Sequence, residues 1–197
     1  MRRSRQDAAV TRERIVEAAS HEFRLNGIAE GLEDIMKTAG LTHGGFYRHF
    51  ESKSQLISEA VALAFDQLLE GLETAIDGKA AKTALASIVQ HYLSPAMRDH
   101  VESACPLSAI GTELRKTGPE TSAIVSKGSQ RLISLIASQF PHLSPRQAKT
   151  RAHGIAAAMV GGIVLSRLAR DKNLADSILR DTREFILAST GGRDPPE

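Results

Sequence analysis

The chain has 197 residues, of which 25 are Lys or Arg and 23 are Asp or Glu, so its formal net charge is +2. A hydrophobic content of 42% and a charged content of 24% are those of an ordinary soluble globular protein, and they exclude a disordered or fibrous chain. Because the net charge is small, a polyanionic partner would need a local concentration of positive charge.

Cys105 is the single cysteine, so it cannot form an intramolecular disulfide, and no Cys/His spacing resembles a zinc site. The basic N-terminal residues are followed by a charged amphipathic segment and not by the apolar core of a signal peptide. The longest uncharged apolar run, residues 154–165, is shorter than the about 20 residues of a membrane-spanning helix. We therefore expect a cytoplasmic protein without a metal or a cofactor.

Apolar residues recur at helical spacing and almost nowhere alternate, so we predict an all-α fold of about nine helices. The first helix is expected to begin at Thr11, as its cap, and to end at Asn26. A short helix is expected from Leu32 to Ala39. Another is expected to begin at Thr42, again as a cap, and to continue to Phe50.

Ser52 and Gln55 form a predicted capping box, which starts a long helix through about Ile76. Its length is enough to join two structural units. The remaining helices are expected at 79–93, 106–115, 119–140, 144–170 and 173–189, with a connection containing Pro95 after the first of them, Ser144-Pro145 at the start of the fourth and Asn173 as the cap of the last.

Two short helices joined by a turn that contains Gly40 have the pattern of a helix-turn-helix motif. On the second of them, Phe46 and Phe50 are four residues apart and are expected to anchor the helix in the core. The opposite face is polar and small, and it consists of His43, Gly44, Gly45, Tyr47, Arg48 and His49.

Each glycine near the start of a helix costs about 1 kcal/mol relative to alanine, so Gly44 and Gly45 need an explanation. Without side chains there, the helix N-terminus can approach phosphate oxygens or base edges in a DNA major groove. Arg48 would then contact guanine or phosphate, with Tyr47, His49 and Lys53 as phosphate donors. A short helix with a solvated face is the structural alternative.

Residues 40–53, GLTHGGFYRHFESK, resemble the signature of TetR/AcrR-type transcriptional regulators. The resemblance extends over about residues 11–65, and the rest of the chain is similar in layout. It implies a helix-turn-helix DNA-binding domain at residues 1–55 and a ligand-binding and dimerisation domain at 56–197. The implied function is a repressor that binds a palindromic operator as a homodimer and is released by a small-molecule inducer. The family commonly has Ser or Thr at the position of Gly45, so this chain lacks that hydroxyl contact.

The predicted DNA contacts come from two sources. By position, the resemblance assigns such contacts to Thr42, His43, Tyr47, His49 and Lys53, and the helix geometry adds Gly44, Gly45 and Arg48. Arg2, Arg3 and Arg5 precede the expected first helix, in a basic arm at residues 1–10 that would enter the minor groove. A solvated end is the alternative.

Gly154, Ala158 and Gly161 recur at spacings of four and three, which leaves one helix face with little side-chain bulk. The resemblance implies that the last two helices form a four-helix interface in the homodimer. Some combination of Ile155, Val160, Ile163, Ile178 and Phe185 is then expected to be buried by the second copy. A helix contact within one chain is the alternative.

The ligand pocket is harder to predict, because sequence alone does not align its helices with one another. The candidate ligand contacts are His91, Tyr92, Arg98, Cys105, Thr112, His153 and Met159. Cys105 also precedes Pro106 at an expected helix start, where the helix dipole favours a thiolate. A thiol- or electrophile-responsive regulator is therefore an alternative, and a buried, inert cysteine is another.

No GxSxG, P-loop, dinucleotide-binding or Cys–His signature is present in the sequence, so we do not expect an enzyme. A helical enzyme and a helical interaction protein that does not bind DNA are the competing classes. The expected partners are double-stranded operator DNA, a second copy of the chain and an unidentified small-molecule effector.

Overall fold

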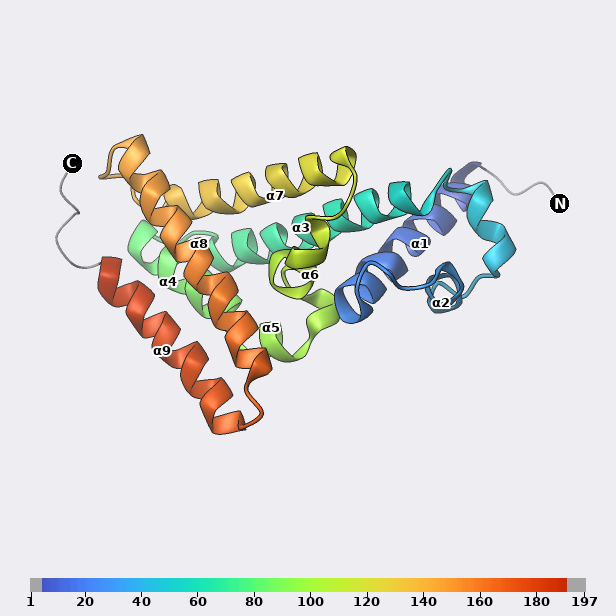
Figure 1. Cartoon of the computed structure of the whole chain (residues 1–197). Helices are drawn as coiled ribbons and strands as arrows, with labels where there is room; N and C mark the ends of the chain where they lie inside the picture. The colour runs from blue at the N-terminus through green and yellow to red at the C-terminus, as the bar shows by residue number, and fades with distance from the viewer. Residues whose placement is uncertain (1–4, 191–197) are drawn as a thin grey trace. The chain divides into compact units, whose positions relative to one another are not determined.

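The computed structural model describes residues 5–190, with only the backbone of Arg5. All regular secondary structure in this range is helical, which confirms the predicted all-α class (Figure 1). The elements are α1 (Arg5–Asn26), α2 (Leu32–Thr38), the 3₁₀-helix η1 (His43–Arg48), α3 (Lys53–Ile76), α4 (Ala81–Tyr92), α5 (Pro95–Asp99), the 3₁₀-helix η2 (Val101–Ser103), α6 (Pro106–Leu114), α7 (Pro119–Ala137), α8 (Pro145–Leu168) and α9 (Lys172–Thr190).

These helices fall into two compact units. The first unit contains the residues up to Leu68 together with Val101–Gly128, and the second contains Leu69–His100 and the residues from Ser129 onward. Both α3 and α7 therefore contribute residues to each unit. The functional boundary expected at residue 55 stays a prediction.

The first unit has one apolar core, to which α1, α2, η1, α3 and α6 all contribute. Phe23, Ile35 and Phe46 are each at most 1% exposed, and Ile110 and Leu114 of α6 are each 3% exposed in the same core. Burying a side chain of this size contributes about 1.5–3 kcal/mol. The packing of α6 against α1 therefore stabilises the N-terminal helices through residues far away in sequence.

The predicted start of the first helix was wrong. α1 begins at Arg5 and not at Thr11, and the Thr11 hydroxyl donates a hydrogen bond of 2.7 Å to the carbonyl of Asp7. A threonine bonded to the carbonyl four residues earlier lies inside a helix and does not cap it. Within the described residues, 5–10 therefore belong to α1 and not to an extended arm.

The segment after α2 also differs from its prediction. η1 is a 3₁₀-helix, and the side chain of Thr42 makes no capping hydrogen bond, although its carbonyl accepts one of 3.0 Å from the N–H of Gly45. The expected capping box at α3 is half formed. Ser52 Oγ accepts a hydrogen bond of 3.1 Å from the N–H of Gln55, while the Gln55 side chain accepts from Glu51 and not from Ser52.

The later helices follow their expected positions with two differences. The Pro95 connection contains a short helix, α5, because the Ser94 hydroxyl accepts a hydrogen bond of 3.1 Å from the N–H of Met97. The cap of α9 is Asp171 and not Asn173, since an Asp171 carboxylate oxygen accepts a hydrogen bond of 3.0 Å from the N–H of Asn173. The capping box predicted at Ser144 is fully formed.

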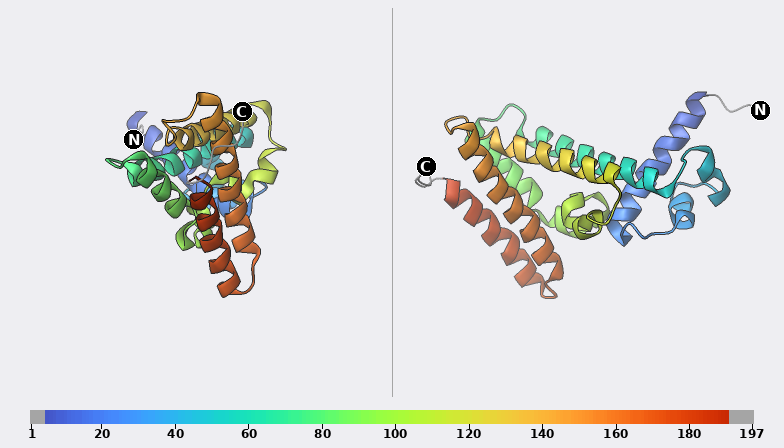
Figure 2. Two further views of the ribbon diagram at one scale, coloured as in Figure 1. Left: turned by 90° about the vertical axis from the view of Figure 1, so that its left-hand side faces the viewer. Right: turned by 45° about the horizontal axis from the view of Figure 1, so that its top comes forward.

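In the second unit, α8 and α9 run side by side (Figures 1 and 2). Arg98 of α5 is 7% exposed and forms ion pairs of 2.6 Å with Asp99 and with Asp176 of α9. Arg167 of α8 donates hydrogen bonds to the carbonyls of Met97 and Arg98, at 2.7 and 3.0 Å. These contacts fix α5 to both C-terminal helices.

None of the helices in the described residues combines the length and the apolar character needed to cross a membrane. No group of three or more His, Cys, Asp or Glu side chains in residues 5–190 is arranged to hold a metal ion.

Candidate nucleic-acid interface

The recognition segment, residues 42–53, is anchored by two aromatic rings. Phe46 and Phe50 are 0% and 3% exposed, as predicted from their spacing, and their rings stack with centroids 5.4 Å apart. The carbonyl of Met36 accepts a hydrogen bond of 2.8 Å from the N–H of Leu41, which fixes the turn between α2 and η1. The buried rings therefore determine which face of η1 points to solvent.

The outward face of η1 carries polar and aromatic side chains. Tyr47 is 68% exposed, and its ring meets the ring of Phe46 edge-on with centroids 5.1 Å apart. Thr42, His43 and Arg48 are also exposed, while His49 is half-buried. The predicted contact residues therefore lie on one accessible surface, with Tyr47 held by its packing on a buried ring.

Neither glycine of η1 is required by packing within the chain. A Cβ atom added at Gly44 would meet nothing within 4 Å, and one at Gly45 would lie 3.7 Å from the terminal carbon of Met36, an ordinary contact. Neither has a positive φ. Since a Cβ atom fits at both positions, packing within the protomer does not explain the two glycines, and their role in a close approach to DNA stays a prediction.

Arg12 of α1 holds the C-terminal end of η1, which sequence reasoning missed. Its guanidinium lies 4.6 Å from the centroid of the Phe50 ring, donates a hydrogen bond of 3.3 Å to the carbonyl of His49 and pairs with Glu59 of α3. Arg14, two residues further along, donates a hydrogen bond of 2.7 Å to the carbonyl of Ala39. α1 therefore orients both helices of the motif through arginine side chains.

Lys53, at the start of α3, is half-buried with its ammonium 5.9 Å from the centroid of the Phe23 ring. Lysine can pack its methylene chain on apolar surface and still present its charged end to an anion. This position is therefore compatible with the predicted phosphate contact. Arg2 and Arg3 lie outside the described residues, and so does the side chain of Arg5.

The seven candidate ligand residues are distributed over both units. Cys105 and Thr112 belong to the first unit, and the other five belong to the second. Cys105, Tyr92 and Met159 are each 0% exposed, Arg98 is held by its two ion pairs, and His91, Thr112 and His153 are exposed. Their role in ligand binding stays a prediction.

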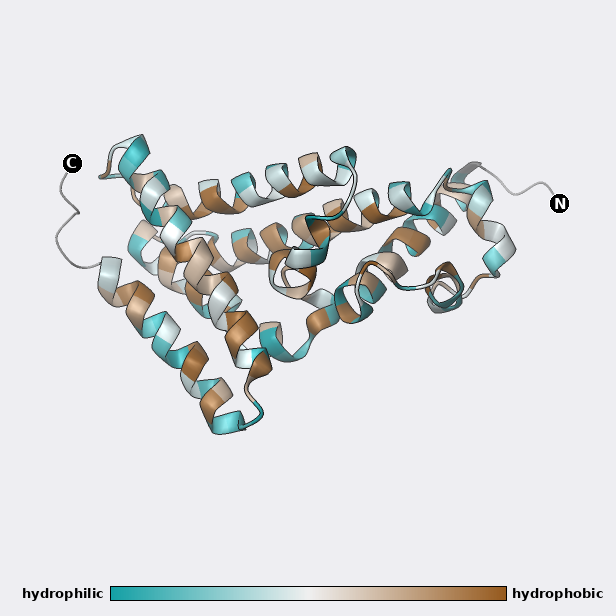
Figure 3. Cartoon of the chain, in the orientation of Figure 1, coloured by the Kyte–Doolittle hydropathy of each residue, from teal (hydrophilic) through white to brown (hydrophobic). Residues whose placement is uncertain are grey.

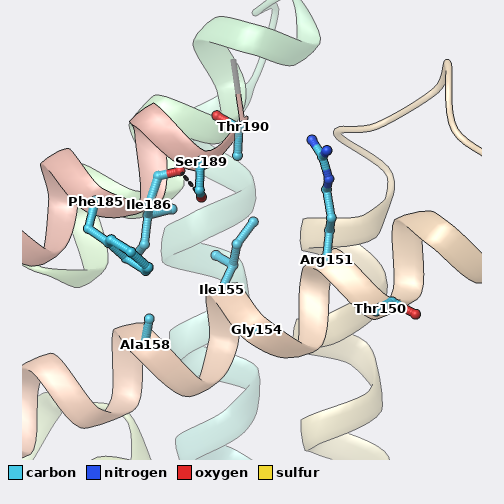
Figure 4. A pocket seen from close by; sticks show the side chains of 9 residues that line it. All are labelled: Thr150, Arg151, Gly154, Ile155, Ala158, Phe185, Ile186, Ser189 and Thr190. Atoms are coloured by element: carbon cyan, nitrogen blue, oxygen red, sulfur yellow. Dashed lines mark hydrogen bonds between the residues drawn. The ribbon is translucent and has the colours of Figure 1, made fainter. Parts of the chain in front are cut away.

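The five residues predicted at a dimer interface do lie together, along α8 and α9. Gly154, Ala158 and Phe185 line a shallow groove of about 390 Å³ (Figure 4). Ala158, Gly161, Ile178 and Phe185 line an adjoining groove of about 490 Å³. Figure 3 shows hydrophobic positions along the whole of α9. The exposed large apolar side chains of these two helices are Leu165, Leu168, Leu174, Phe185 and Leu187.

The comparisons with known proteins agree with this geometry. Residues 15–60 match the family model described as bacterial regulatory proteins, tetR family. An uncharacterised HTH-type transcriptional regulator of Mycobacterium tuberculosis is 25% identical over 188 residues, which are 90% of this chain and 94% of the relative. The HTH-type transcriptional regulator TtgR of Pseudomonas putida is 41% identical over 58 residues, 29% of this chain and 28% of that protein.

Solved structures share the fold over nearly the whole chain. The crystal structure of a TetR transcriptional regulator from Chloroflexus aurantiacus has a TM-score of 0.82 at 25% identity and covers 95% of this chain and 98% of its own. The reduced form of NemR from Escherichia coli has a TM-score of 0.77 at 16% identity, over 90% and 95% of the two chains.

The fold and the exposed face of η1 define a DNA-binding transcriptional regulator of the helix-turn-helix class. The match of residues 15–60 to the tetR family model, the relatives and the solved structures support, more specifically, a regulator of the TetR family.

Proposed function

We propose that the protein is a ligand-responsive repressor that binds a near-palindromic operator as a homodimer through residues 42–53. The observation that carries the proposal is the outward face of η1, where Gly44 leaves open space beside the exposed side chains of Tyr47 and Arg48. A helix lacking bulk at its N-terminal end can bring its N–H groups close to DNA phosphates.

The dimer is supported by the faces of α8 and α9. A Cβ atom added at Gly154 or at Gly161 would meet nothing within 4 Å, so packing within one chain does not explain these small residues. Phe185 is 68% exposed and Leu168 is 74% exposed beside them. Burial against a second copy would remove this apolar surface from water.

Footprinting with the purified full chain on the DNA upstream of its own coding region tests the proposal. Two recognition segments in a dimer should protect half-sites about 34–36 Å apart, on one face of the duplex. Protection of a symmetric site is the expected result. A failure to protect any site over a range of salt concentrations, without added small molecules, would contradict operator binding by the unliganded protein.

Release by an effector requires a ligand that binds more tightly to a form with displaced recognition segments. Two features support such coupling. The helix α3 begins in residues 42–53 and continues to Ile76, among residues of the second unit. In addition, Arg24 of α1 donates a hydrogen bond of 3.1 Å to the carbonyl of Ala104, in the segment that leads into α6.

A thiol response is the second candidate, because Cys105 lies beside a buried cation. Burial lowers the pKa of Arg24 to about 10, while the negative charges of Cys105, when ionised, and of Glu102 act in the opposite direction. The same cation stabilises a thiolate. However, Cys105 is 0% exposed, so an electrophile reaches it only after local opening.

Cys105→Ser separates the two candidates. If the effector binds reversibly, the variant should bind the operator and be released as the wild type is. A variant that binds the operator but is no longer released by an alkylating electrophile, while the wild type is, would support the thiol response.

A further inference from the structure

A groove of about 730 Å³ lies in the second unit, and it shares one lining residue, Thr190, with the groove of about 390 Å³ on the proposed dimer face. It is formed by the first turns of α4, the segment between α7 and α8, and the C-terminal end of α9. Its volume is within the about 300–1,000 Å³ of small-molecule sites. The lining residues are Ala81, Lys82, Thr83, Leu85, Ala86, Gln139, Phe140, Pro141, His142, Leu187 and Thr190.

The inner part of this groove is apolar. Leu85 and Phe140 are each 4% exposed, and Leu187 of α9 is still 38% exposed at its edge. Ala86, another lining residue, is half-buried. An alkyl chain placed here would remove the remaining exposed surface of Leu187 from water, at about 25 cal/mol for each Å².

The outer part of the groove carries the positive charge of Lys82, which is exposed. None of the described residues that line the groove is Asp or Glu, and His142 is a further exposed polar side chain there. The guanidinium of Arg151, which lines the neighbouring groove of about 390 Å³, lies 5.8 Å from the centroid of the Phe140 ring and adds a second positive charge near the site. The lining therefore matches a ligand with one negative group and one apolar group.

The N-terminus of α4 also favours an anion in this groove. Its N-cap residue, Ala80, provides no side-chain hydrogen bond, so no side chain of that residue satisfies the N–H groups of the first turn at Ala81, Lys82 and Thr83. The N-terminus of a helix carries a partial positive charge that stabilises an anion. This partial charge adds to the positive charge of Lys82. The shape of the groove does not depend on it.

We propose that this groove is a binding site for an amphipathic carboxylate, with the carboxylate beside Lys82 and the alkyl chain over Leu85, Phe140 and Leu187. Its role as the effector site rests on the proposed function, whereas binding itself does not. Because the site belongs to one protomer, binding can be measured on the full chain without DNA.

The test compares decanoate with the uncharged 1-decanol by calorimetry on the full-length protein. Decanoate is expected to bind at least ten-fold more tightly than decanol, because only decanoate interacts with the cationic edge. Lys82→Met should remove most of this preference, and Lys149→Met, which changes an exposed lysine of α8 outside the groove lining, should keep it. Equal affinities for the two probes in the wild type would overturn the proposal.

Ala86→Phe tests the position of the site by filling the groove. It should weaken binding of both probes at least ten-fold, in a protein whose melting temperature shows that it is folded. Unchanged affinity in folded Ala86→Phe would place decanoate elsewhere and overturn the proposal. If decanoate binds only to a variant that ends at Thr190, residues 191–197 occupy the groove in the full chain. That result would also overturn the proposal.

The response on DNA is measured separately. Release of a protected operator by decanoate, lost in Lys82→Met, would support the effector role. Decanoate that binds in the groove without releasing the operator would support the site and contradict that role. A protein that binds decanoate but protects no operator would contradict the proposed function and leave the site standing.

Discussion

The carboxylate of Glu113 on α6 accepts a hydrogen bond of 3.0 Å from the backbone N–H of Ile28, just after the end of α1. The same carboxylate lies against Gly27, where φ is +92° and an added Cβ atom would be 2.9 Å from a Glu113 oxygen. A residue of α6 therefore completes the C-terminal turn of the first helix, and it does so within the unit that carries the helix-turn-helix motif.

Glu113→Ala should destabilise the protein by about 1–2 kcal/mol, because the N–H of Ile28 loses its acceptor while remaining partly buried. Urea unfolding of the full chain measures this change. Glu113→Gln should lose less, since an amide oxygen can still accept the bond. Glu70→Ala, at an exposed position of α3, is the control, and an equal loss in both alanine variants would show that the hydrogen bond contributes nothing.

Gly44→Ala should raise stability and lower operator affinity. Alanine fits the backbone and meets nothing within 4 Å, so it should stabilise the fold by about 0.4–1 kcal/mol. The added methyl group would hold the helix N-terminus away from DNA. Urea unfolding and a mobility-shift titration measure the two effects.

Gly111→Ala is the matched control for that pair of measurements. A Cβ atom added at Gly111, in α6, would also meet nothing within 4 Å, and this glycine has no positive φ, yet it lies outside the recognition segment. Its substitution should leave operator affinity unchanged. If Gly44→Ala binds the operator as tightly as the wild type, the glycines do not serve close approach.

Lys53 and Arg48 should differ in how they contribute to DNA binding. Lys53→Ala should weaken binding to all sequences and reduce the slope of log K against log salt by about one, because one phosphate contact is lost. Arg48→Ala should relax the preference at one operator position at a cost of about 1–3 kcal/mol. Titrations on operator and unrelated DNA at several salt concentrations distinguish them, and an equal loss on both DNAs in Arg48→Ala would assign Arg48 to phosphate.

Features that depend on a local sequence pattern could be predicted from the sequence alone. The bounds of α3 were predicted, with its start marked by the cap at Ser52. In the structure a left-handed glycine, Gly78, follows its end. Phe46 and Phe50 were predicted as anchors from a spacing of four residues alone. In each case the physical cause lies within a few residues of the feature.

Contacts between distant residues were not predictable. Arg12 and Glu59 are 47 positions apart, and no local pattern indicates that they pair beside Phe50. The same limit applies to adjacent glycines. A Cβ atom at Gly161 would meet nothing within 4 Å, whereas one at Gly162 would lie 2.9 Å from the side chain of Leu93, a difference that only the arrangement of the helices determines.

Stability should fall in acid through Asp99. The side-chain hydrogen bond from Arg98 lowers the pKa of Asp99 below its ordinary value. The unfolded chain therefore takes up this proton at a higher pH than the folded one, so the stabilisation is present at neutral pH and is lost as the pH falls from about 5 through the folded-state pKa. Asp99 is 56% exposed, so the contribution is at most about 1 kcal/mol.

Urea unfolding of Asp99→Asn between pH 7 and pH 2 measures that contribution. The variant should be slightly less stable than the wild type at pH 7, and the two should converge at the acid end. Asp77→Asn, at an exposed position after α3, is the control. Asp171 is not suitable, because its side chain caps α9. A constant difference between wild type and Asp99→Asn at every pH would show that the ion pair does not titrate in this range.

Gly161→Leu should weaken the dimer without unfolding the protomer. A Cβ atom at this position meets nothing within 4 Å in the chain, so the leucine side chain can extend toward a second copy packed against α8 and α9 in the proposed dimer. Gly162→Ala is the contrasting variant, because its methyl group would collide with Leu93 and approach Thr182 at 3.1 Å, which should destabilise the protomer itself by about 1–3 kcal/mol. Sedimentation at nanomolar concentration and urea unfolding separate the two effects. Operator affinity should fall with dimer affinity in Gly161→Leu, and a variant that stays dimeric at nanomolar concentration would show that Gly161 lies outside the interface.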